Sequence, residues 1–104
     1  MNWNPSDHDL ADHDLVSATK DAVACEFGEG LALLNLKSNI YYSLNSVGAF
    51  IWDLIQQPKS IGDIRGAVLA RYNVDPARCK ADVDALLKGL ADNGLARLHH
   101  EELV

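Results

Sequence analysis

LLNLKSNIYYSLNSVGAFIW, residues 33–52, decides the fold, because its first half has the pattern of two strands and its second half that of a helix. The run LALLNL, residues 31–36, is apolar on both faces, as expected for a central strand. KSN, residues 37–39, is short enough for a hairpin loop in which Asn39 can adopt a left-handed conformation. IYYSL, residues 40–44, is rich in strand formers. The stretch therefore predicts a hairpin that continues directly into a helix.

Three helices are predicted from residue 46 onward, because apolar residues recur there at helical spacing between caps and stops. The core stripes are Val47, Phe50, Ile51, Leu54 and Ile55; Ile61, Ile64, Val68, Leu69 and Tyr72; and Val83, Leu86, Leu87 and Leu90. The predicted N-caps are Asn45 or Ser46, Ser60 and Asp75. Pro58 ends the first helix and Gly94 closes the third. The second and third helices could together form a helix-turn-helix.

A further strand is predicted on each side of this region. Residues 22–27 alternate with a period of two, which predicts a strand with one buried face. That buried face would carry Val23, Cys25 and Phe27. GEG, residues 28–30, predicts a turn after this strand. LARL, residues 95–98, predicts a short last strand. Three antiparallel strands followed by three helices packed on one face of a small sheet predict the α+β class.

The 104-residue chain, 48% of it hydrophobic, is long enough for one compact domain. Residues 1–20 are polar and acidic and contain DHDL twice, which predicts a solvated arm that need not be ordered, outside a domain of residues 21–104. His8 and His13 of this repeat lie five residues apart, on different sides of a helix, beside hard carboxylates that zinc sites rarely use. We therefore predict no metal site.

Composition and motifs argue against several classes of function. With 15 acidic and 9 basic residues, the net charge of -6 repels phosphate backbones, so nucleic acid is not an expected partner. The sequence has no bilayer-spanning apolar run and no signal-peptide pattern at residue 1, so we expect a cytoplasmic protein that does not bind membranes, with Cys25 and Cys79 reduced. Patterns for Cys–His, serine, phosphate-loop and paired-carboxylate chemistry are all incomplete. We expect no catalytic residue and no cofactor.

The strand at residues 40–44 is the candidate binding feature. In a three-stranded meander it has one neighbour, and it carries no Lys, Pro or bulge that would discourage further pairing. Such an edge can bind an extended peptide through main-chain hydrogen bonds. Proline at Tyr42 is expected to abolish this binding without unfolding the domain. Alternatively, the acidic arm, the third helix or a second copy of the chain covers the edge.

A row of small and charged residues on the third helix could complete a groove. Arg78, Asp82, Ala85 and Gly89 lie beside the core stripe, where small residues let another backbone approach and the charges can fix its register. Glycine in mid-helix costs about 1 kcal/mol relative to alanine, which suggests that something packs closely at Gly89. Either a bound chain or another element of the same domain could do so.

From residue 22 to residue 98 the sequence resembles the PqqD-like family, small peptide-binding chaperones named after pyrroloquinoline quinone biosynthesis. The resemblance rests on the order and spacing of Leu44–Asn45, Gly48, Trp52, Asp82 with Val83, and Gly94–Leu95. It implies a winged-helix-like recognition element that binds the leader of a ribosomally synthesised precursor peptide as a strand beside the third strand and presents it to a modifying enzyme. The peptide-binding residues that it implies are Ile40, Tyr41, Tyr42, Ser43 and Leu44 on the strand and Arg78, Asp82, Ala85 and Leu86 on the third helix.

The resemblance implies a radical-SAM enzyme as partner or, in lasso-peptide pathways, a leader peptidase and a cyclase. QQPKS, residues 56–60, replaces the Asp-Gly-x-Arg-Thr-type turn of the quinone-pathway members, and Asn39 stands where many relatives have glycine. The replaced turn argues against the quinone pathway itself. Two alternatives stay open: a winged-helix regulator that binds DNA through its third helix, and a structural subunit or homodimer that pairs through its edge strands.

Overall fold

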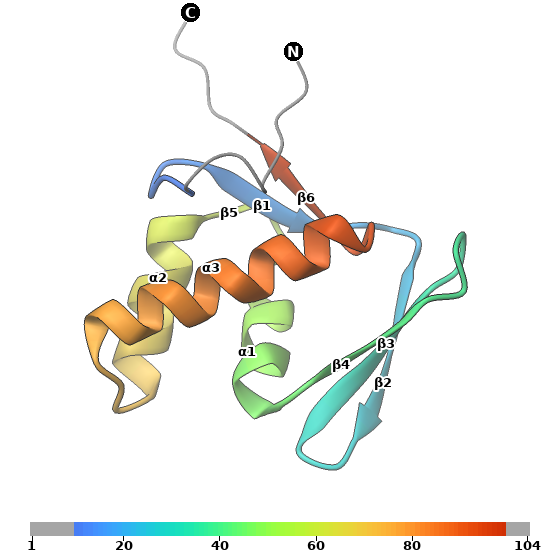
Figure 1. Ribbon diagram of the computed structural model, residues 1–104, viewed down its shortest axis with the longest axis horizontal. Helices are drawn as coiled ribbons and strands as arrows, with labels where there is room; N and C mark the ends of the chain where they lie inside the picture. Colours follow the sequence, from blue (N-terminus) through green and yellow to red (C-terminus); the bar gives the residue numbers. More distant parts are fainter. Residues whose placement is uncertain (1–9, 100–104) are drawn as a thin grey trace, which may run out of the picture.

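The computed structural model describes residues 10–99 (Figure 1). The elements follow one another as β1 (Leu15–Ala18), β2 (Ala22–Phe27), β3 (Gly30–Asn35), β4 (Tyr41–Leu44), α1 (Ser46–Leu54), β5 (Lys59–Ser60), α2 (Ile61–Arg71), α3 (Pro76–Asp92) and β6 (Ala96–His99). This order confirms the α+β class and the antiparallel meander that leads into three helices.

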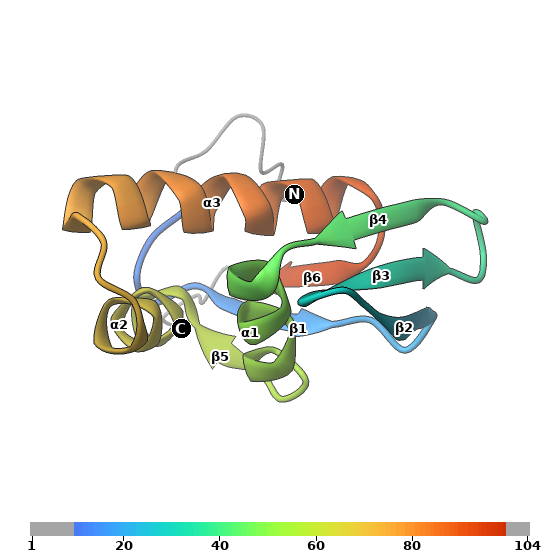
Figure 2. The same ribbon diagram turned by 90° about the horizontal axis from the view of Figure 1, so that it is seen from below.

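Two three-stranded antiparallel sheets frame the molecule. One is the predicted meander, in the order β2-β3-β4, with Leu33 of the central strand facing Ala24 on one side and Tyr42 on the other. The second sheet, in the order β5-β1-β6, joins segments from both ends of the chain and was not predicted. Figure 2 shows α3 running along one side of the molecule, with β6 next to it and with α2 and β5 on the opposite side.

Helix caps and turns form where the sequence places them. Each N-cap side chain accepts a backbone N–H of the first turn: Asn45 from Gly48 at 2.9 Å, Ser60 from Asp63 at 3.1 Å and Asp75 from Arg78 at 3.2 Å. Asn39 in the hairpin loop has a φ of 60°, and Gly94 after α3 has a φ of 69°. Both are the left-handed conformations that a tight turn and a helix end require. The local signals therefore position α1 directly after β4.

The core fills the space between the three helices and the inner faces of the two sheets. Its most deeply buried apolar side chains are Val16, Leu33, Ile51, Ile55, Ile61, Ile64, Val83, Leu87, Leu90 and Leu95. Gly30 is required at the junction of this core with the β4 end, because a Cβ there would overlap the backbone carbonyl oxygen of Leu44. β3 and the start of α1 can therefore lie against each other.

The expectation of an arm outside the core is wrong for residues 10–20. Leu15–Ala18 forms β1, which pairs with both β5 and β6, and the side chains of Leu10, Asp14 and Val16 are buried. The pairing partners lie more than forty residues away in sequence, so local polarity could not reveal them. The remainder of the predicted arm, residues 1–9, lies outside the described residues.

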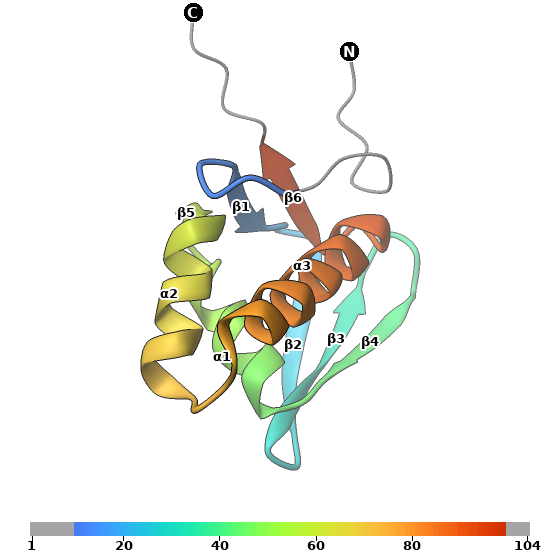
Figure 3. The same ribbon diagram turned by 60° about the vertical axis from the view of Figure 1, so that its left-hand side comes forward.

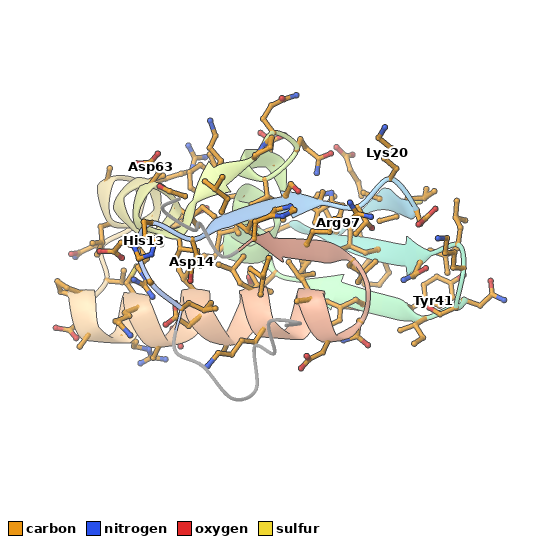
Figure 4. The ribbon with its side chains drawn as sticks, turned by 90° about the horizontal axis from the view of Figure 1, so that it is seen from above. His13, Asp14, Lys20, Tyr41, Asp63 and Arg97 are labelled. Atoms are coloured by element: carbon orange, nitrogen blue, oxygen red, sulfur yellow. The ribbon has the colours of Figure 1, made fainter. Side chains whose placement is uncertain are left out.

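Arg65 of α2 holds this N-terminal segment in place. Its guanidinium pairs with the Asp12 carboxylate, donates to the Leu10 carbonyl oxygen at 3.1 Å and lies 2.6 Å from the Asp84 carboxylate. Desolvation lowers the pKa of Arg65, but hydrogen bonds and attraction to Asp84 and Asp12 outweigh it, so the pKa is raised overall. An aspartate of the second DHDL copy thus serves an ion-pair network. Figure 4 shows His13 and Asp14 at this end of the molecule, far from Tyr41.

The predicted buried face of β2 is also wrong. Phe27 is 72% exposed and Val23 43% exposed, and Cys25 is exposed as well. Val23, Cys25 and Phe27 do share one face of the strand, but this is the face of the meander that is turned away from the helices. The strand pattern fixed which residues share a face, and it could not show that this face stays uncovered.

Candidate functional site

One edge of β4 has no neighbouring strand in the structure of residues 10–99. In its sheet, β4 pairs with β3 alone. Figure 3 shows β4 on the outside of the meander, with β3 as its one neighbouring strand in that sheet. The third strand of the meander is therefore an edge strand, as the sequence predicts.

The direction of the β4 backbone groups follows from one hydrogen bond. The Asn35 N–H donates to the Ile40 carbonyl oxygen at 2.9 Å, and hydrogen-bonded and non-hydrogen-bonded pairs alternate along an antiparallel ladder. The N–H and C=O of Tyr42 therefore point to β3, whereas those of Tyr41 and Ser43 point to the open edge. This corrects the expectation for proline at Tyr42, which would remove a hydrogen bond within the sheet.

A hollow of about 600 Å³ lies beside this edge. Residues of β4, α1, α2, α3 and the loop before α3 line it: Tyr41, Tyr42, Ser43, Leu44, Asn45, Val47, Gly48, Ile51, Val68, Tyr72, Val74, Cys79, Asp82, Val83 and Leu86. Most of these side chains are apolar. Tyr72 at the rim packs edge-on against Phe50, with 5.7 Å between ring centroids, which fixes the ring beside the opening.

The β4 side chains alternate between the two faces of the sheet. Leu44 is buried and Tyr42 is half-buried against the core, while Tyr41 is 72% exposed and Ser43 is exposed. Figure 4 shows Tyr41 at the far end of the meander. A strand added beside β4 would have the same alternation, so every second side chain would point toward α3.

The polar groups of the hollow are few and are not arranged for catalysis. The Asp82 carboxylate is exposed and lies 3.5 Å from Nε of Arg78, one helical turn away. Cys79 is buried, with its Sγ 3.7 Å from the Arg65 carbonyl oxygen. Burial raises the pKa of the Cys79 thiol, so the thiol is neutral near pH 7 and a poor nucleophile.

The structure brings six of the nine predicted peptide-binding residues to the hollow. These are Tyr41, Tyr42, Ser43, Leu44, Asp82 and Leu86. Ile40, Arg78 and Ala85 are exposed and do not line it. Sequence reasoning missed the contribution of α1 and α2, whose lining residues were assigned to the core stripes. A helical stripe shows which residues avoid water, but not that some of them also border a hollow beside a strand.

Gly89, the innermost member of the row on α3, packs against another element of the same domain. A Cβ at residue 89 would overlap the hydroxyl oxygen of Tyr42 and lie 3.3 Å from its Cζ. Of the two explanations for this glycine, packing within the domain is therefore the one that the structure supports.

The charges of α3 do not form a cationic surface. Arg78 pairs with Asp82, and Lys80 lies 3.4 Å from Asp84, so two of the three cations of α3 are paired on the helix itself. The helix also carries as many aspartates as cations. Residues 10–99 hold no group of three or more His, Cys, Asp or Glu side chains that could bind a metal ion. None of the helices in this described part is long and apolar enough to cross a membrane.

The architecture is that of a small α+β recognition domain with an open sheet edge beside an apolar groove. The family model of coenzyme PQQ synthesis protein D (PqqD) matches residues 30–96, and the chain belongs to this family. No match was found among curated proteins.

Three solved structures have a similar fold. TbiB1 in complex with the TbiA(beta) leader peptide is 27% identical, with a TM-score of 0.71 over 82% of this chain and 99% of that one. A lasso peptide synthetase B1 complexed with its leader peptide is 24% identical, with a TM-score of 0.68 over 79% of this chain and 96% of that one. The PqqD truncation of Methylobacterium extorquens PqqCD, a stand-alone RiPP recognition element, is 18% identical, with a TM-score of 0.71 over 91% of this chain and 99% of that one.

Proposed function

We propose that this protein is a non-catalytic recognition element that binds the leader of a ribosomally synthesised precursor peptide and presents it to a modifying enzyme. The observation that carries the proposal is the open edge of β4 beside an apolar hollow. The family and the two leader-peptide complexes among the similar structures support it. The precursor would be met in the cytoplasm, where it is synthesised.

The leader binds as an added strand. Tyr41 and Ser43 provide the N–H and C=O groups that pair with it, and main-chain pairing of this kind provides affinity without dictating sequence. Every second leader side chain then enters the hollow between Leu44 and Leu86. A volume of about 600 Å³ lies within the usual range for ligand sites, and its apolar lining selects aliphatic or aromatic side chains.

The remaining predicted residues act at the rim. Arg78 and Asp82 are exposed next to the opening and contact the ends of the bound segment, while Ile40 extends the edge toward the hairpin loop. Rim charges of this kind contribute to register and to the association rate more than to affinity.

The enzyme that receives the leader acts on the core of the precursor. A leader peptidase with a cyclase is the preferred partner, because a lasso peptide synthetase B1 is among the similar structures. A radical-SAM enzyme is the alternative. The protein itself supplies no catalytic group, since the Cys79 thiol in the hollow is neutral and the Asp82 carboxylate is exposed and paired with Arg78.

Fluorescence polarisation tests the proposal. The probes are labelled leaders of the short peptides encoded beside the gene, the TbiA(beta) leader as a heterologous reference, and a labelled DNA duplex, each at low and moderate salt. Submicromolar binding of one encoded leader that persists at moderate salt is expected, because apolar and main-chain contacts are weakly screened. Binding of the duplex alone, weakening steeply with salt, would instead support the DNA-binding alternative.

A further inference from the structure

Gly89 lies in α3, and Gly66 is the second of the two glycines in α2. The surroundings of Gly89 and Gly66 differ. A Cβ at Gly66 of α2 would have no atom within 4 Å, whereas a Cβ at Gly89 of α3 would overlap the Tyr42 hydroxyl oxygen and lie 3.3 Å from its Cζ and 3.6 Å from its Cε2. Alanine is the better helix former at both positions. Of these two positions, Gly89 is the one where a contact explains why the residue has no side chain.

The Tyr42 ring crosses from β4 to α3 at the end of the hollow. Tyr42 lines the hollow, and so does Leu86, which precedes Gly89 by three positions and therefore lies on the same face of α3. No hydrogen bond among residues 10–99 uses the Tyr42 hydroxyl, so packing alone holds the ring in this position. Whatever occupies position 89 thus decides where the ring lies.

We propose that Gly89 is a positioning residue of the peptide site: it seats the Tyr42 ring against α3 and thereby keeps the ring out of the space that a leader side chain enters. This inference rests on the proposed function and adds a specificity determinant to it. A methyl group at position 89 displaces the ring toward the hollow that it lines, so the first inward side chain of the leader must be smaller or must shift along β4.

The test compares Gly89→Ala with Gly66→Ala, which makes the same change in a helix where nothing is near. The probe is the encoded leader that binds the wild-type protein most tightly, and the TbiA(beta) leader is run beside it. Gly89→Ala is expected to raise the Kd by about tenfold, and Gly66→Ala by less than about twofold. Unfolding in urea, followed for both variants, establishes that each is folded.

A double-mutant cycle isolates the role of the ring. Tyr42→Phe removes the oxygen that the new methyl group would meet, and the remaining ring carbon at 3.3 Å needs only a small adjustment. The Kd of Tyr42→Phe/Gly89→Ala is expected to lie within about threefold of that of Tyr42→Phe alone. If the double variant binds as weakly as Gly89→Ala, the alanine obstructs the peptide directly and the proposed role of Tyr42 is wrong.

A measurement without peptide tests the contact itself. In the wild-type protein, nuclear Overhauser effects are expected between the Tyr42 ring protons and the Gly89 Hα protons, and their absence would overturn the inference even if Gly89→Ala failed to fold. Wild-type binding that Gly89→Ala leaves unchanged would also overturn it, while the proposed function would stand. If the wild-type protein binds no leader, the proposed function itself fails.

Discussion

Proline at Ser43 should separate peptide binding from folding. The Ser43 N–H points to the open edge of β4, so Ser43→Pro removes no hydrogen bond of the sheet, and proline is tolerated on edge strands. An added strand would lose this donor, and the pyrrolidine ring would hold the peptide away from a second bond beside it. Two main-chain bonds at about 1 kcal/mol each correspond to about a thirtyfold rise in the leader Kd.

The matched control is proline on the opposite edge of the same sheet. Just outside the β2–β3 ladder, the Leu36 N–H donates to the Asp21 carbonyl oxygen at 2.8 Å, and the alternation that follows along β2 turns the Ala24 N–H outward. Ala24→Pro should therefore match Ser43→Pro in thermal unfolding but bind leader like the wild type. Polarisation titrations of both variants give the comparison. Equal leader affinities for Ser43→Pro and the wild type would refute strand addition at β4.

Three further changes test the packing that holds the groove. Arg65→Met should lower the free energy of unfolding in urea by about 3 kcal/mol. The reason is that it leaves the Asp84 carboxylate, which is 12% exposed, without its main partner. A loss of stability below about 1 kcal/mol would contradict this. Gly30→Ala should unfold the meander, seen by circular dichroism, since its Cβ would overlap a backbone oxygen at the end of β4; a folded variant of normal stability would show that the strand ends can separate. At pH 8, Cys25 should react with a thiol reagent much faster than Cys79, because the raised pKa of the buried Cys79 thiol leaves less thiolate. Bound leader should slow the reaction of Cys79 further. Equal reaction rates for the two cysteines would contradict the buried position of Cys79.

The meander, the three helices and their caps were predictable because each depends on local signals. The Asn45 side chain and the left-handed Asn39 act within a few residues, and the structure confirms both. The free edge of β4 follows from strand order, which short hairpin loops also make local. These features were enough to locate one wall of the candidate groove.

The second sheet, and the contribution of α1 and α2 to the hollow, were not predictable, because they depend on how separate elements pack against one another. β1 pairs with β6, which is about 80 residues later in the sequence, and no residue pattern within either strand predicts this pairing. Residues such as Val68 and Val83 read as core in a helical stripe, yet they also line the hollow. Gly89 shows the opposite case: its sequence signal was clear, and only the structure could identify Tyr42 as the side chain that packs on it.

The most direct test of strand addition is amide hydrogen exchange at β4, measured by nuclear magnetic resonance with and without leader. In the free protein the N–H groups of Tyr41 and Ser43 should exchange fast, because they point to an open edge. Bound leader should slow both, while the outward N–H of Ala24 on β2 keeps its rate. Saturating leader that leaves Tyr41 and Ser43 unprotected, or that protects Ala24 instead, would contradict the account.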